Sequence, residues 1–567
     1  MTEMELYTRW LANALEDPDL SAELKAIEGK EDEIHDRFYR ELEFGTAGLR
    51  GVIGAGTNRM NIYVIRRATQ GLADYINQKY ENPTIAISYD SRIKSDLFAK
   101  EAAAVLAANG IHVYIYSELM PVPMVSFATR ELKCQAGIMV TASHNPSKYN
   151  GYKVYGDDGC QMTSESADAV LALINSTDIF EGVKRISFEE GLAAGTIEYI
   201  SDEIVEKYLS EVLALQVNPE AAKEAGLKIV YTPLNGAGNK PVRTVLARMG
   251  IENVAVVPEQ EYPDGNFPTC PYPNPEIREA MAKGCELCEK LGYDLLLATD
   301  PDCDRVGIAV KHEGEYQLLT GNEVGALLLD YIAKNRIEKG TMPKDPIAVK
   351  TIVTTKLVDA IAKEYGVQVI DVLTGFKYIG EQIFLLEEKN EKERYILGFE
   401  ESYGYLSGTH ARDKDAVNGA MLICEMASYH KLNGKTLVTA LNELYAKHGI
   451  FIDTQQSFAF EGSEGMAKMA GIMDNLRQNG IASIAGMPVN YTADYKLSVK
   501  KSAEGETVIN LPKSNVLEYG IACGSVIVRP SGTEPKIKIY YSIQGSTREE
   551  AEALLASIKA DMAQYMK

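Results

Sequence analysis

Thr141-Ala-Ser-His-Asn-Pro-Ser-Lys-Tyr-Asn-Gly-Tyr-Lys153 is the stretch that decides which fold and which chemistry the sequence predicts. The run just before it, Ala136 to Val140, is short and apolar, which is typical of a buried parallel strand. A strand that ends here places the Ser143 hydroxyl and the His144 imidazole at its carboxyl end, where open α/β sheets bind ligands. The stretch therefore predicts a ligand site at a strand end in an α/β domain.

Two turns are expected within this stretch. Asn145-Pro146 favours the first, because the residue before a proline is pushed out of the helical region. Asn150-Gly151 favours the second, so that Tyr152 to Tyr155 returns as a strand carrying Lys153. A Ser-His pair by itself more often marks an ordinary surface turn, so its chemistry depends on the rest of the chain.

An apolar run followed by a polar loop recurs along the chain, with helical patterns in between. The further apolar runs are residues 84–88, 228–231, 294–298, 347–350 and 395–397. Strands that alternate with helices favour right-handed βαβ units and mainly parallel sheets, and the loops after these strands are expected to line one cleft. Residues 491–500 and 536–542 instead alternate apolar and polar, which predicts a smaller α+β domain with an antiparallel sheet.

The composition narrows the choice of partners. A net charge of −22 disfavours nucleic acid and anionic membranes, although a local basic cluster can still bind a small anion. We find neither a signal peptide nor an apolar run approaching the ~18 residues of a membrane helix. The lone Cys285-x-x-Cys288 has no second pair, so no zinc or redox site is expected. We expect a cytoplasmic protein in a reducing compartment.

Asp300-Pro-Asp302-Cys-Asp304 is the second strong signal. Alternate residues of an extended loop point the same way, so three carboxylates converge on one hard cation. The loop is not an EF-hand, because Arg305 and Lys311 stand where that motif needs glycine and glutamate. Without a cation or a basic partner, carboxylates this close repel one another.

Two further loops have the composition of phosphate sites. Phe44 to Gly51 combines three glycines with Arg50, so that the backbone can approach an anion and the guanidinium can bind it in a bidentate manner. Arg529 to Lys536 combines an arginine, hydroxyls and a glycine in one tight turn, which predicts an anion nest.

Together these motifs resemble those of the α-D-phosphohexomutases, the phosphoglucomutase and phosphomannomutase family, and within it the bacterial-type enzymes. The stretch around Ser143 resembles the family's phosphoserine loop, Asp300 to Arg305 its magnesium loop, and Arg529 to Pro535 its phosphate loop. Phe44 to Gly51 resembles the family's Gly-Thr-Ser-Gly-Leu-Arg motif, with Ala47 in place of the serine. The resemblance begins at about residue 44 and reaches the end of the chain; residues 1–43 add nothing to it.

Three more segments resemble family loops around the sugar. Gly398 to Ser402 is similar to the Gly-Glu-Glu-Ser loop, with Phe399 inserted after the glycine. Thr374-Gly-Phe-Lys377 is similar to a Thr-Gly-aromatic-Lys loop, and His410-Ala-Arg-Asp-Lys-Asp415 to a segment whose lysine, here Lys414, lies in the active site.

The resemblance implies a heart-shaped protein of three similar mixed or parallel-sheet α/β domains and a smaller C-terminal α+β domain. We expect these domains at residues 1–205, 206–322, 323–452 and 453–567. The implied metal ligands are Ser143, Asp300, Asp302 and Asp304. The implied catalytic residues are Ser143, His144, Lys153, Arg50 and Lys414. The implied substrate-binding residues are Arg305, Thr374, Lys377, Glu400, Ser402, Arg529, Ser531, Gly532 and Thr533.

The implied reaction interconverts glucose 1-phosphate and glucose 6-phosphate, with Mg²⁺ as cofactor and glucose 1,6-bisphosphate as activator and intermediate. Lys153 and Lys414 are candidates for general acid and base, with His144 as an alternative. The implied partners are small sugar phosphates, and the chain is expected as a monomer or homodimer.

Other functions stay open at this stage. The Glu-Glu-Ser loop favours glucose over mannose, but the inserted Phe399 resembles a subgroup that includes phosphopentose mutases. A catalytically silent sugar-phosphate sensor would need the anion nest but not the nucleophile, and the presence of Ser143, the three aspartates and both lysines argues against it. A phosphatase is a further rival, because a phosphoserine could lose its phosphate to water, but hydrolysis has no need of the sugar and phosphate loops that hold both ends of a substrate.

Overall fold

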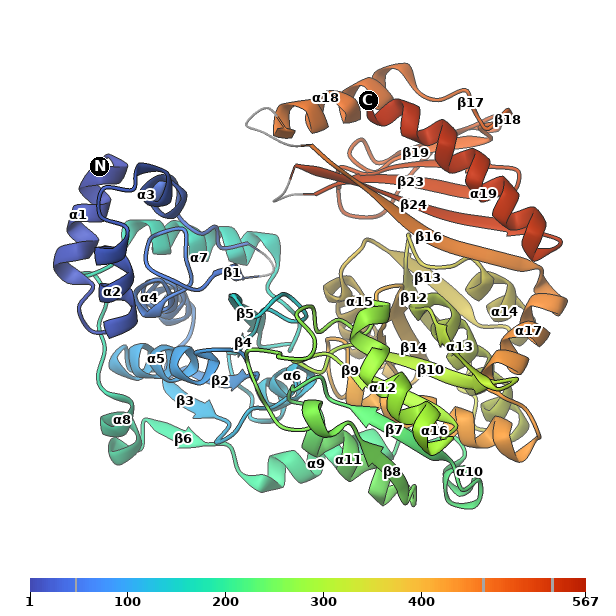
Figure 1. The fold of residues 1–567 in the computed structure, drawn as a ribbon, viewed down its shortest axis with the longest axis horizontal. Helices are drawn as coiled ribbons and strands as arrows, with labels where there is room; N and C mark the ends of the chain where they lie inside the picture. The colour runs from blue at the N-terminus through green and yellow to red at the C-terminus, as the bar shows by residue number, and fades with distance from the viewer. Residues whose placement is uncertain (46–47, 461–464, 532–534) are drawn as a thin grey trace. The chain divides into compact units, whose positions relative to one another are not determined.

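The computed structural model describes residues 1–45, 48–460, 465–531 and 535–567. It divides into two compact units: Met1–Leu319, Gly380–Glu393 and Tyr403–Gly434 form the first, and Thr320–Ile379, Arg394–Ser402 and Lys435–Lys567 the second. Three mixed α/β regions and a C-terminal antiparallel sheet follow one another along the chain (Figure 1), as the sequence predicted. Of the predicted site, Gly532 and Thr533 lie outside the described residues.

The first unit begins with three short helices, α1 (Glu3–Asn13), α2 (Pro18–Ala26) and α3 (Glu31–Phe38). α2 begins where it does because Asp17 caps it and Pro18 occupies its first position. Trp10 is fully buried against Phe38, Tyr63 and Phe180, which fixes α1 on the rest of the unit.

The first sheet has the strand order β1-β5-β4-β2-β3-β6. Its strands are β1 (Leu49–Val52), β2 (Thr84–Tyr89), β3 (His112–Ile115), β4 (Ala136–Val140), β5 (Tyr149–Gly156) and β6 (Ile197–Tyr199). Four strands are parallel, while β5 and β1 are antiparallel additions. The expectation of mainly parallel sheets is thus correct for β2, β3, β4 and β6 only, since β5 returns directly from the serine loop beside β4.

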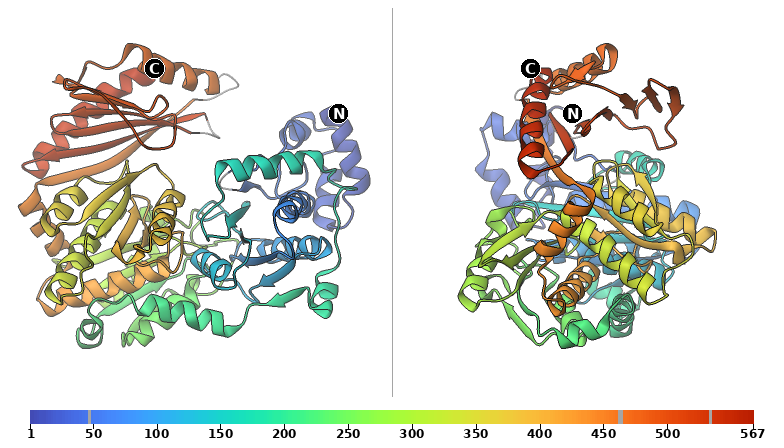
Figure 2. Two further views of the ribbon diagram at one scale, coloured as in Figure 1. Left: turned by 180° about the vertical axis from the view of Figure 1, so that it is seen from behind. Right: turned by 90° about the vertical axis from the view of Figure 1, so that its right-hand side faces the viewer.

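Helices cover both faces of this sheet (Figures 1 and 2). The helices of this region are α4 (Ile62–Lys79), α5 (Ser95–Ala108), α6 (Val122–Glu131), α7 (Ser164–Ser176), α8 (Phe188–Ala194) and α9 (Asp202–Leu213). Asn61 caps α4 by accepting from the Val64 amide at 3.0 Å, and α4 then packs with α5 and α7 in one large apolar core.

The second sheet has the order β11-β10-β9-β7-β8, with β7, β8 and β9 parallel and the β10–β11 hairpin antiparallel. Its strands are β7 (Lys228–Thr232), β8 (Asn253–Val256), β9 (Leu295–Thr299), β10 (Val306–His312) and β11 (Glu315–Leu319). Around it lie α10 (Pro219–Glu224), α11 (Asn239–Arg248), η1 (Pro258–Gln260), α12 (Arg278–Leu291) and α16 (Ala416–Leu432). β15 (Gly404–Leu406) also belongs to this unit.

The second unit contains the parallel strands β13 (Gln368–Val372), β12 (Ile347–Thr351) and β14 (Tyr395–Glu400). Its helices here are α13 (Gly321–Glu338), α14 (Leu357–Tyr365) and α17 (Leu437–His448). A capping box between Thr320 and Glu323 starts α13. α15 (Phe376–Glu388) and η2 (Lys392–Arg394) each have residues in both units.

The chain ends in a seven-stranded antiparallel sheet of order β16-β24-β23-β22-β19-β20-β21. Its strands are β16 (Ile450–Ala459), β19 (Tyr491–Asp494), β20 (Val499–Ser502), β21 (Gly505–Val508), β22 (Leu517–Ile521), β23 (Gly524–Pro530) and β24 (Lys536–Gly545). α18 (Gly465–Asn479), the hairpin β17–β18 (Ser483–Ile484, Met487–Pro488), α19 (Arg548–Met562) and η3 (Ala563–Met566) complete it. Residues 491–500 form a hairpin rather than one alternating strand, because β19 ends at Asp494.

The two faces of this last sheet have different neighbours. Along β24, Ile539 and Tyr541 point into a core with α18 and α19. Tyr540, between them, packs with Ile352 and Leu373 from the ends of the parallel strands of the same unit. The alternation of a strand thus joins the last sheet to the preceding α/β region through one apolar layer.

Candidate active site

Ser143 lies at the end of β4 in an unusual backbone conformation. Its φ of +52° is in the left-handed region, which costs a non-glycine residue of the order of 1 kcal/mol. The amide donates to Thr141 Oγ1 at 2.7 Å, and the buried hydroxyl lies 3.1 Å from both His144 Nδ1 and Asp300 Oδ2. The predicted nucleophile and the first aspartate of the predicted metal loop are therefore in direct contact.

Arg92 fixes this loop and was assigned no role from the sequence. Its guanidinium donates to the carbonyl oxygens of Ser143, Asn145, Pro146 and Tyr149. It is fully buried and balanced by Asp90, whose carboxylate lies 3.4 Å away. The sequence does place Arg92 in a loop after an apolar strand, where functional residues are expected. It does not indicate that the guanidinium binds four carbonyl groups.

The second turn of the serine loop is not at Asn150-Gly151. The structure places that turn at residues 146–149, with the Tyr149 amide donating to the Pro146 carbonyl at 3.0 Å, and Asn150 and Gly151 lie inside β5. Gly151 is needed because a Cβ there would lie 2.4 Å from the Thr141 carbonyl oxygen. The turn prediction was wrong because glycine here serves close packing between backbones.

Asp300, Asp302 and Asp304 come together as predicted, after β9. All three are buried, and each has a carboxylate oxygen within 4.8 Å of the others. Asp300 Oδ1 accepts from the amides of Asp304 and Arg305 at 3.0 Å, which fixes the loop. Burial and the two neighbouring aspartates raise the pKa of Asp300 well above its usual range.

Two lysines face these carboxylates. Lys153 Nζ lies 3.0 Å from Asp302 Oδ2 and 3.6 Å from Asp304 Oδ2. Lys414 Nζ lies 3.2 Å from that same Asp304 oxygen. Burial lowers the pKa of Lys153, but Asp302 and Asp304 outweigh it and raise the pKa overall, so Lys153 is protonated at neutral pH. Burial raises the pKa of Asp304, but Lys414 and Lys153 outweigh it and hold the pKa well below its usual value.

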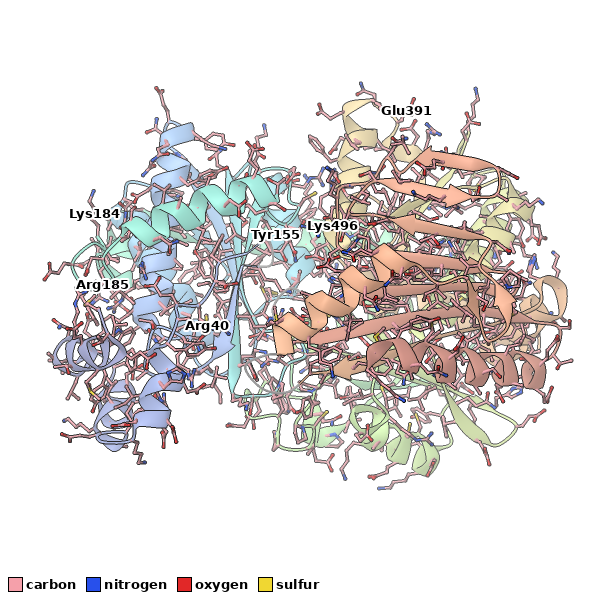
Figure 3. The ribbon with its side chains drawn as sticks, turned by 90° about the horizontal axis from the view of Figure 1, so that it is seen from above. Arg40, Tyr155, Lys184, Arg185, Glu391 and Lys496 are labelled. Carbon is pink, nitrogen blue, oxygen red and sulfur yellow. The ribbon has the colours of Figure 1, made fainter. Side chains whose placement is uncertain are left out.

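Lys414 is held from both sides. Its neighbour Asp413 accepts from the Lys414 ammonium at 3.2 Å and from the hydroxyl of Tyr155, labelled in Figure 3, at 2.9 Å. Asp415 caps α16 and accepts from the Tyr208 hydroxyl and His410 Nε2. Tyr155 and Tyr208 lie far from Lys414 in sequence, so no local pattern predicts their contacts with Asp413 and Asp415.

The remaining donor atoms suit a hard divalent cation. Oδ1 of Asp302 and of Asp304 are buried without a hydrogen-bond partner in the described structure. The third oxygen, Asp300 Oδ2, accepts only from Ser143 among the hydrogen bonds of the described residues. Three carboxylate oxygens and one hydroxyl oxygen are a ligand set typical of Mg²⁺, so the residues fit the predicted ion.

Basic and imidazole groups surround this centre. Arg50, on β1, donates to Asn145 Oδ1 at 3.2 Å and is exposed. Arg305 forms an ion pair with Glu276, a carboxylate that the sequence did not single out. Burial and the charges of Arg305 and Arg50 lower the pKa of His144 well below its usual value, so its imidazole is neutral at pH 7.

The predicted sugar-binding residues lie in the second unit. Glu400 is the last residue of β14, so Gly398 to Glu400 is strand and not loop. Its Oε1 accepts from the Gly375 amide at 2.9 Å, which brings the Thr374–Lys377 and Glu400–Ser402 segments together. Thr374 Oγ1 is buried without a hydrogen-bond partner in the described structure, and Ser402 is half-buried.

Arg529 is half-buried near the end of β23, in the same unit. Beyond β23, the Ser531 amide donates to the Lys536 carbonyl at 2.8 Å. Burial and the charges of Glu401 and Glu400 raise the pKa of Tyr540 to about 12, while a hydrogen bond with Arg529 lowers it. The Tyr540 hydroxyl is thus influenced by charges from both the predicted sugar segment and the predicted phosphate segment.

Sequence comparison assigns the family. Four models of the phosphoglucomutase/phosphomannomutase family match: alpha/beta/alpha domain I at residues 41–179, domain II at 206–314, domain III at 320–448 and the C-terminal domain at 488–560. The chain belongs to the phosphoglucomutase/phosphomannomutase family.

Curated relatives in this family carry the name phosphoglucomutase. The protein of Staphylococcus saprophyticus is 36% identical over 92% of this chain and 94% of its own length. That of Staphylococcus aureus strain USA300 is 38% identical over 90% and 91%.

Solved structures support the phosphohexomutase fold. A putative phosphomannomutase from Thermus thermophilus aligns with a TM-score of 0.69 at 22% identity, over 93% of this chain and 99% of that one. The phosphoglucomutase parafusin from Paramecium aligns with a TM-score of 0.67 at 15% identity, over 93% and 95%.

The structure also bears on the cysteines and on membrane-spanning helices, whereas three other expectations are not tested by it. All eight cysteines are free thiols, Cys285 and Cys288 included. None of the described helices combines the length and apolarity needed to span a membrane. The four domain boundaries, the cytoplasmic location and the oligomeric state stay predictions.

Proposed function

We propose that this enzyme interconverts glucose 1-phosphate and glucose 6-phosphate through a phosphorylated Ser143. The observation that carries the proposal is the Ser143 hydroxyl at 3.1 Å from Asp300, in a group of three buried aspartates flanked by Lys153 and Lys414. Relatives named phosphoglucomutase that align over nine-tenths of the chain favour glucose as the sugar.

Phosphoryl transfer proceeds in two steps in this proposal. In the first, a free hydroxyl of the sugar phosphate attacks phosphorus, the bond from phosphorus to Ser143 Oγ breaks, and glucose 1,6-bisphosphate forms. The hydroxyl loses its proton to a base, and Oγ leaves as an alkoxide or takes up a proton. In the second step, Ser143 Oγ loses its proton to a base and attacks the other phosphorus of the bisphosphate. The bond from that phosphorus to the sugar oxygen breaks, the sugar oxygen takes up a proton, and the isomeric sugar phosphate is released from the phosphorylated enzyme.

The charge on the transferring group is the main problem that the protein must solve. Mg²⁺ held by Asp300, Asp302, Asp304 and the serine oxygen would supply Lewis-acid neutralisation of that charge. Arg50 and Arg305 would add fixed positive charge. Arg92 holds the Ser143 carbonyl, so the nucleophile needs little reorganisation when the reaction begins.

We assign the proton transfers to Lys153 and Lys414. Lys153 is buried and kept protonated by Asp302 and Asp304, so it is available as a proton donor first. His144 is the alternative: its imidazole is neutral, and Nδ1 lies 3.1 Å from Ser143 Oγ, within reach of a proton on that oxygen.

In the second unit we assign the sugar hydroxyls to Glu400, Ser402, Thr374 and Lys377. Arg529, Ser531, Gly532 and Thr533 would bind the phosphate that is not being transferred. Support comes from the charges of Glu400 and Arg529, which both act on the pKa of Tyr540. A reaction that treats the two ends of a bisphosphate in turn needs a holder for the idle phosphate, and a phosphatase does not.

A substrate panel tests the proposal. Glucose 1-phosphate, mannose 1-phosphate and a pentose 1-phosphate are each supplied with Mg²⁺ and the matching bisphosphate, and product isomers are resolved by NMR. We expect the highest kcat/KM for glucose 1-phosphate and an increase in rate with glucose 1,6-bisphosphate. A higher kcat/KM for the pentose phosphate would show that the enzyme is a phosphopentomutase and not a phosphoglucomutase. Release of free phosphate as the main product would overturn the proposal of a mutase.

A further inference from the structure

Residues 1–43, the N-terminal segment, lie almost entirely before the first family model, which begins at residue 41. Several ion pairs bind the segment to the rest of the first unit. Glu16 lies 2.9 Å from both Arg66 and Arg185, the latter labelled in Figure 3. Two further groups of contacts connect the N-terminal segment to the serine loop, residues 141–150.

The first group starts at Asp17. Oδ1 of this buried carboxylate caps α2 through the Asp19 amide at 3.0 Å, and Oδ2 accepts from Lys94 Nζ at 2.7 Å. Asp19 lies 3.0 Å from the same ammonium. Lys94 has a φ of +62°, a conformation that a side chain seldom adopts without outside support.

Lys94 closes the loop that carries Arg92. The Ser95 amide donates to the Arg92 carbonyl at 3.0 Å, and the Ser95 hydroxyl donates to Asp90 at 2.7 Å. Asp90 in turn balances the Arg92 guanidinium that holds the four carbonyls of the serine loop. Asp17 is thus connected to the Ser143 carbonyl through Lys94, the 90–95 loop and Arg92.

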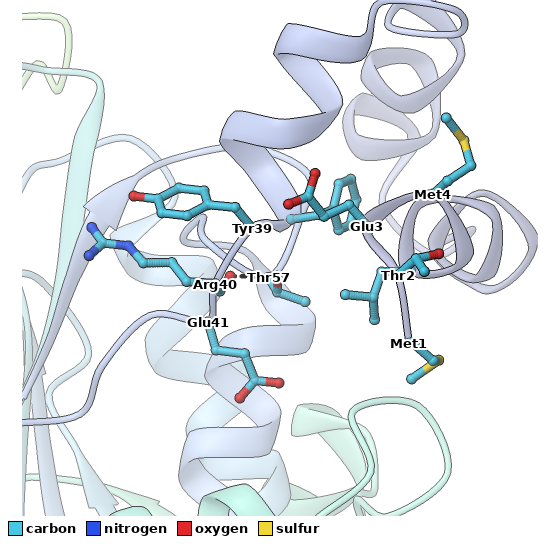
Figure 4. A pocket seen from close by; sticks show the side chains of 10 residues that line it. Met1, Thr2, Glu3, Met4, Tyr39, Arg40, Glu41 and Thr57 are labelled. Carbon is cyan, nitrogen blue, oxygen red and sulfur yellow. Dashed lines mark hydrogen bonds between the residues drawn. The ribbon is translucent and has the colours of Figure 1, made fainter. Parts of the chain in front are cut away.

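The second group reaches the opposite end of the serine loop. Glu23 accepts from the Ala55 amide at 2.7 Å, and Arg37 donates to the Ala55 carbonyl at 3.2 Å. The Thr57 hydroxyl donates to the carbonyl of Arg40 at 2.8 Å (Figure 4). These contacts fix the turn after β1, from which the Ile53 amide donates to the Lys148 carbonyl at 2.8 Å.

We propose that the N-terminal segment is a brace that holds the serine loop in its reactive conformation, with Asp17 as the positioning residue. Neither Asp17 nor Lys94 touches the aspartates, the nucleophile or the lysines of the site, so both act through Arg92. Loss of the brace leaves every reacting side chain present, but the loop that carries Ser143 is held less rigidly. We therefore expect kcat to fall more than KM rises. The effect on rate rests on the proposed function; the effect on the loop does not.

Asp17→Asn is the test variant. Asparagine caps a helix as well as aspartate does, so α2 keeps its first turn while Lys94 loses its buried charged partner and keeps only the exposed Asp19. Arg9→Gln is the matched control, because Arg9 belongs to the same segment and pairs with Asp178 at 2.7 Å without leading to the serine loop. If Asp17→Asn folds poorly, Lys94→Gly removes the same ion pair and tolerates a φ of +62°.

Hydrogen–deuterium exchange of the full chain gives the readout that does not depend on activity. Amides in residues 141–150 are hydrogen-bonded in the ordered loop, among them Ser143, Asn145 and Tyr149. We expect these amides to exchange about 10-fold faster in Asp17→Asn or Lys94→Gly and at the wild-type rate in Arg9→Gln. Equal exchange in all variants would overturn the brace.

A single-turnover measurement then tests the consequence for chemistry. Transfer from glucose 1,6-bisphosphate to Ser143 is followed by intact mass, and we expect it to be about 10-fold slower in Asp17→Asn, with KM for the sugar phosphate changed less than about 2-fold. A larger change in KM than in kcat would contradict a positioning role. If the wild type itself is not phosphorylated, the proposed function fails, and the exchange experiment still decides the brace.

Discussion

The serine–aspartate centre of the first unit and the strand-end residues of the second unit differ in the groups that fix them: buried charged side chains in the first, and for Glu400 in the second the backbone amide of Gly375. Around Ser143, one buried arginine binds four carbonyls, and two lysines pair with the aspartates. In the second unit, Thr374 Oγ1 is buried without a hydrogen-bond partner in the described structure, and Arg529 is half-buried near a strand end.

The difference matches two tasks. A group that stabilises charge developing in a transition state must be fixed beforehand, whereas one that binds a phosphate unchanged throughout the reaction must only be available. We therefore expect damage to the first region to lower kcat and damage to the second to raise KM. Three substitutions test this contrast, beginning with the largest expected effect, and a fourth tests the stability of the second unit.

Ser143→Ala should abolish phosphorylation and reduce mutase activity by roughly 10⁴-fold or more, because no other group replaces the nucleophile. Intact mass after incubation with glucose 1,6-bisphosphate should show one added phosphate in the wild type and none in the variant. Ser147→Ala, in the same loop, is the control and should keep both. Turnover at the wild-type rate in Ser143→Ala would remove the contrast altogether.

Asp302→Asn should lower kcat by about 10²–10³-fold and weaken Mg²⁺ binding, since one anionic ligand is lost next to the transferring group. Titration of Mg²⁺ by calorimetry and steady-state kinetics measure the two effects. Asp157→Asn, on the exposed end of the loop after β5, is the control. Full activity in excess EDTA would show that the aspartates serve structure alone.

Arg529→Ala should raise KM for the sugar phosphate about 10–150-fold through loss of a charged bidentate hydrogen bond of about 1.5–3 kcal/mol. The variant should also depend more on added glucose 1,6-bisphosphate, because the intermediate escapes before it reorients. Kinetics with and without the bisphosphate measure both, and Lys496→Ala, exposed in the turn between β19 and β20 (Figure 3), serves as control. If kcat fell and KM stayed constant, the two regions would not differ in task.

Asp453→Asn should have the smallest effect, on stability alone. Burial raises the pKa of Asp453, and the nearby Ser542 and Thr355 hydroxyls and Lys350 offset this only in part. The folded chain therefore binds this proton more tightly than the unfolded chain does, so this group adds stability as the pH falls through its raised pKa toward its usual value of about 4. Chemical denaturation between about pH 8 and pH 4 should show this contribution in the wild type and not in the variant. If the free energy of unfolding had the same pH dependence in the wild type and in Asp453→Asn, Asp453 would make no such contribution.

Local patterns predicted the parts of the fold that local physics determines. The run Ala136 to Val140 is β4 to the residue, and Asp300, Asp302 and Asp304 converge because a short loop after a strand has few other arrangements. Asn150-Gly151 was misread because a dipeptide that permits a turn also permits two backbones to approach closely, and only the tertiary structure distinguishes the two uses.

The missed residues act over long sequence distances. Arg92 binds carbonyls more than fifty residues away, and Glu276 pairs with Arg305 from the region before α12. Such contacts depend on how strands and helices pack, not on neighbouring residues. The role of residues 1–43 was invisible for the same reason: their contacts lead to loops that follow much later in the chain.

The chain has a single tryptophan, and it is Trp10, fully buried between Phe38, Tyr63 and Phe180 where the N-terminal helices meet α4. The tryptophan fluorescence of the protein therefore reports on the packing of the N-terminal segment alone. Detachment of the segment would expose the indole to water and shift its fluorescence to longer wavelength while both sheets of the first unit remain folded. The molecule thus contains its own fluorescent probe, placed in the segment that precedes the first family model.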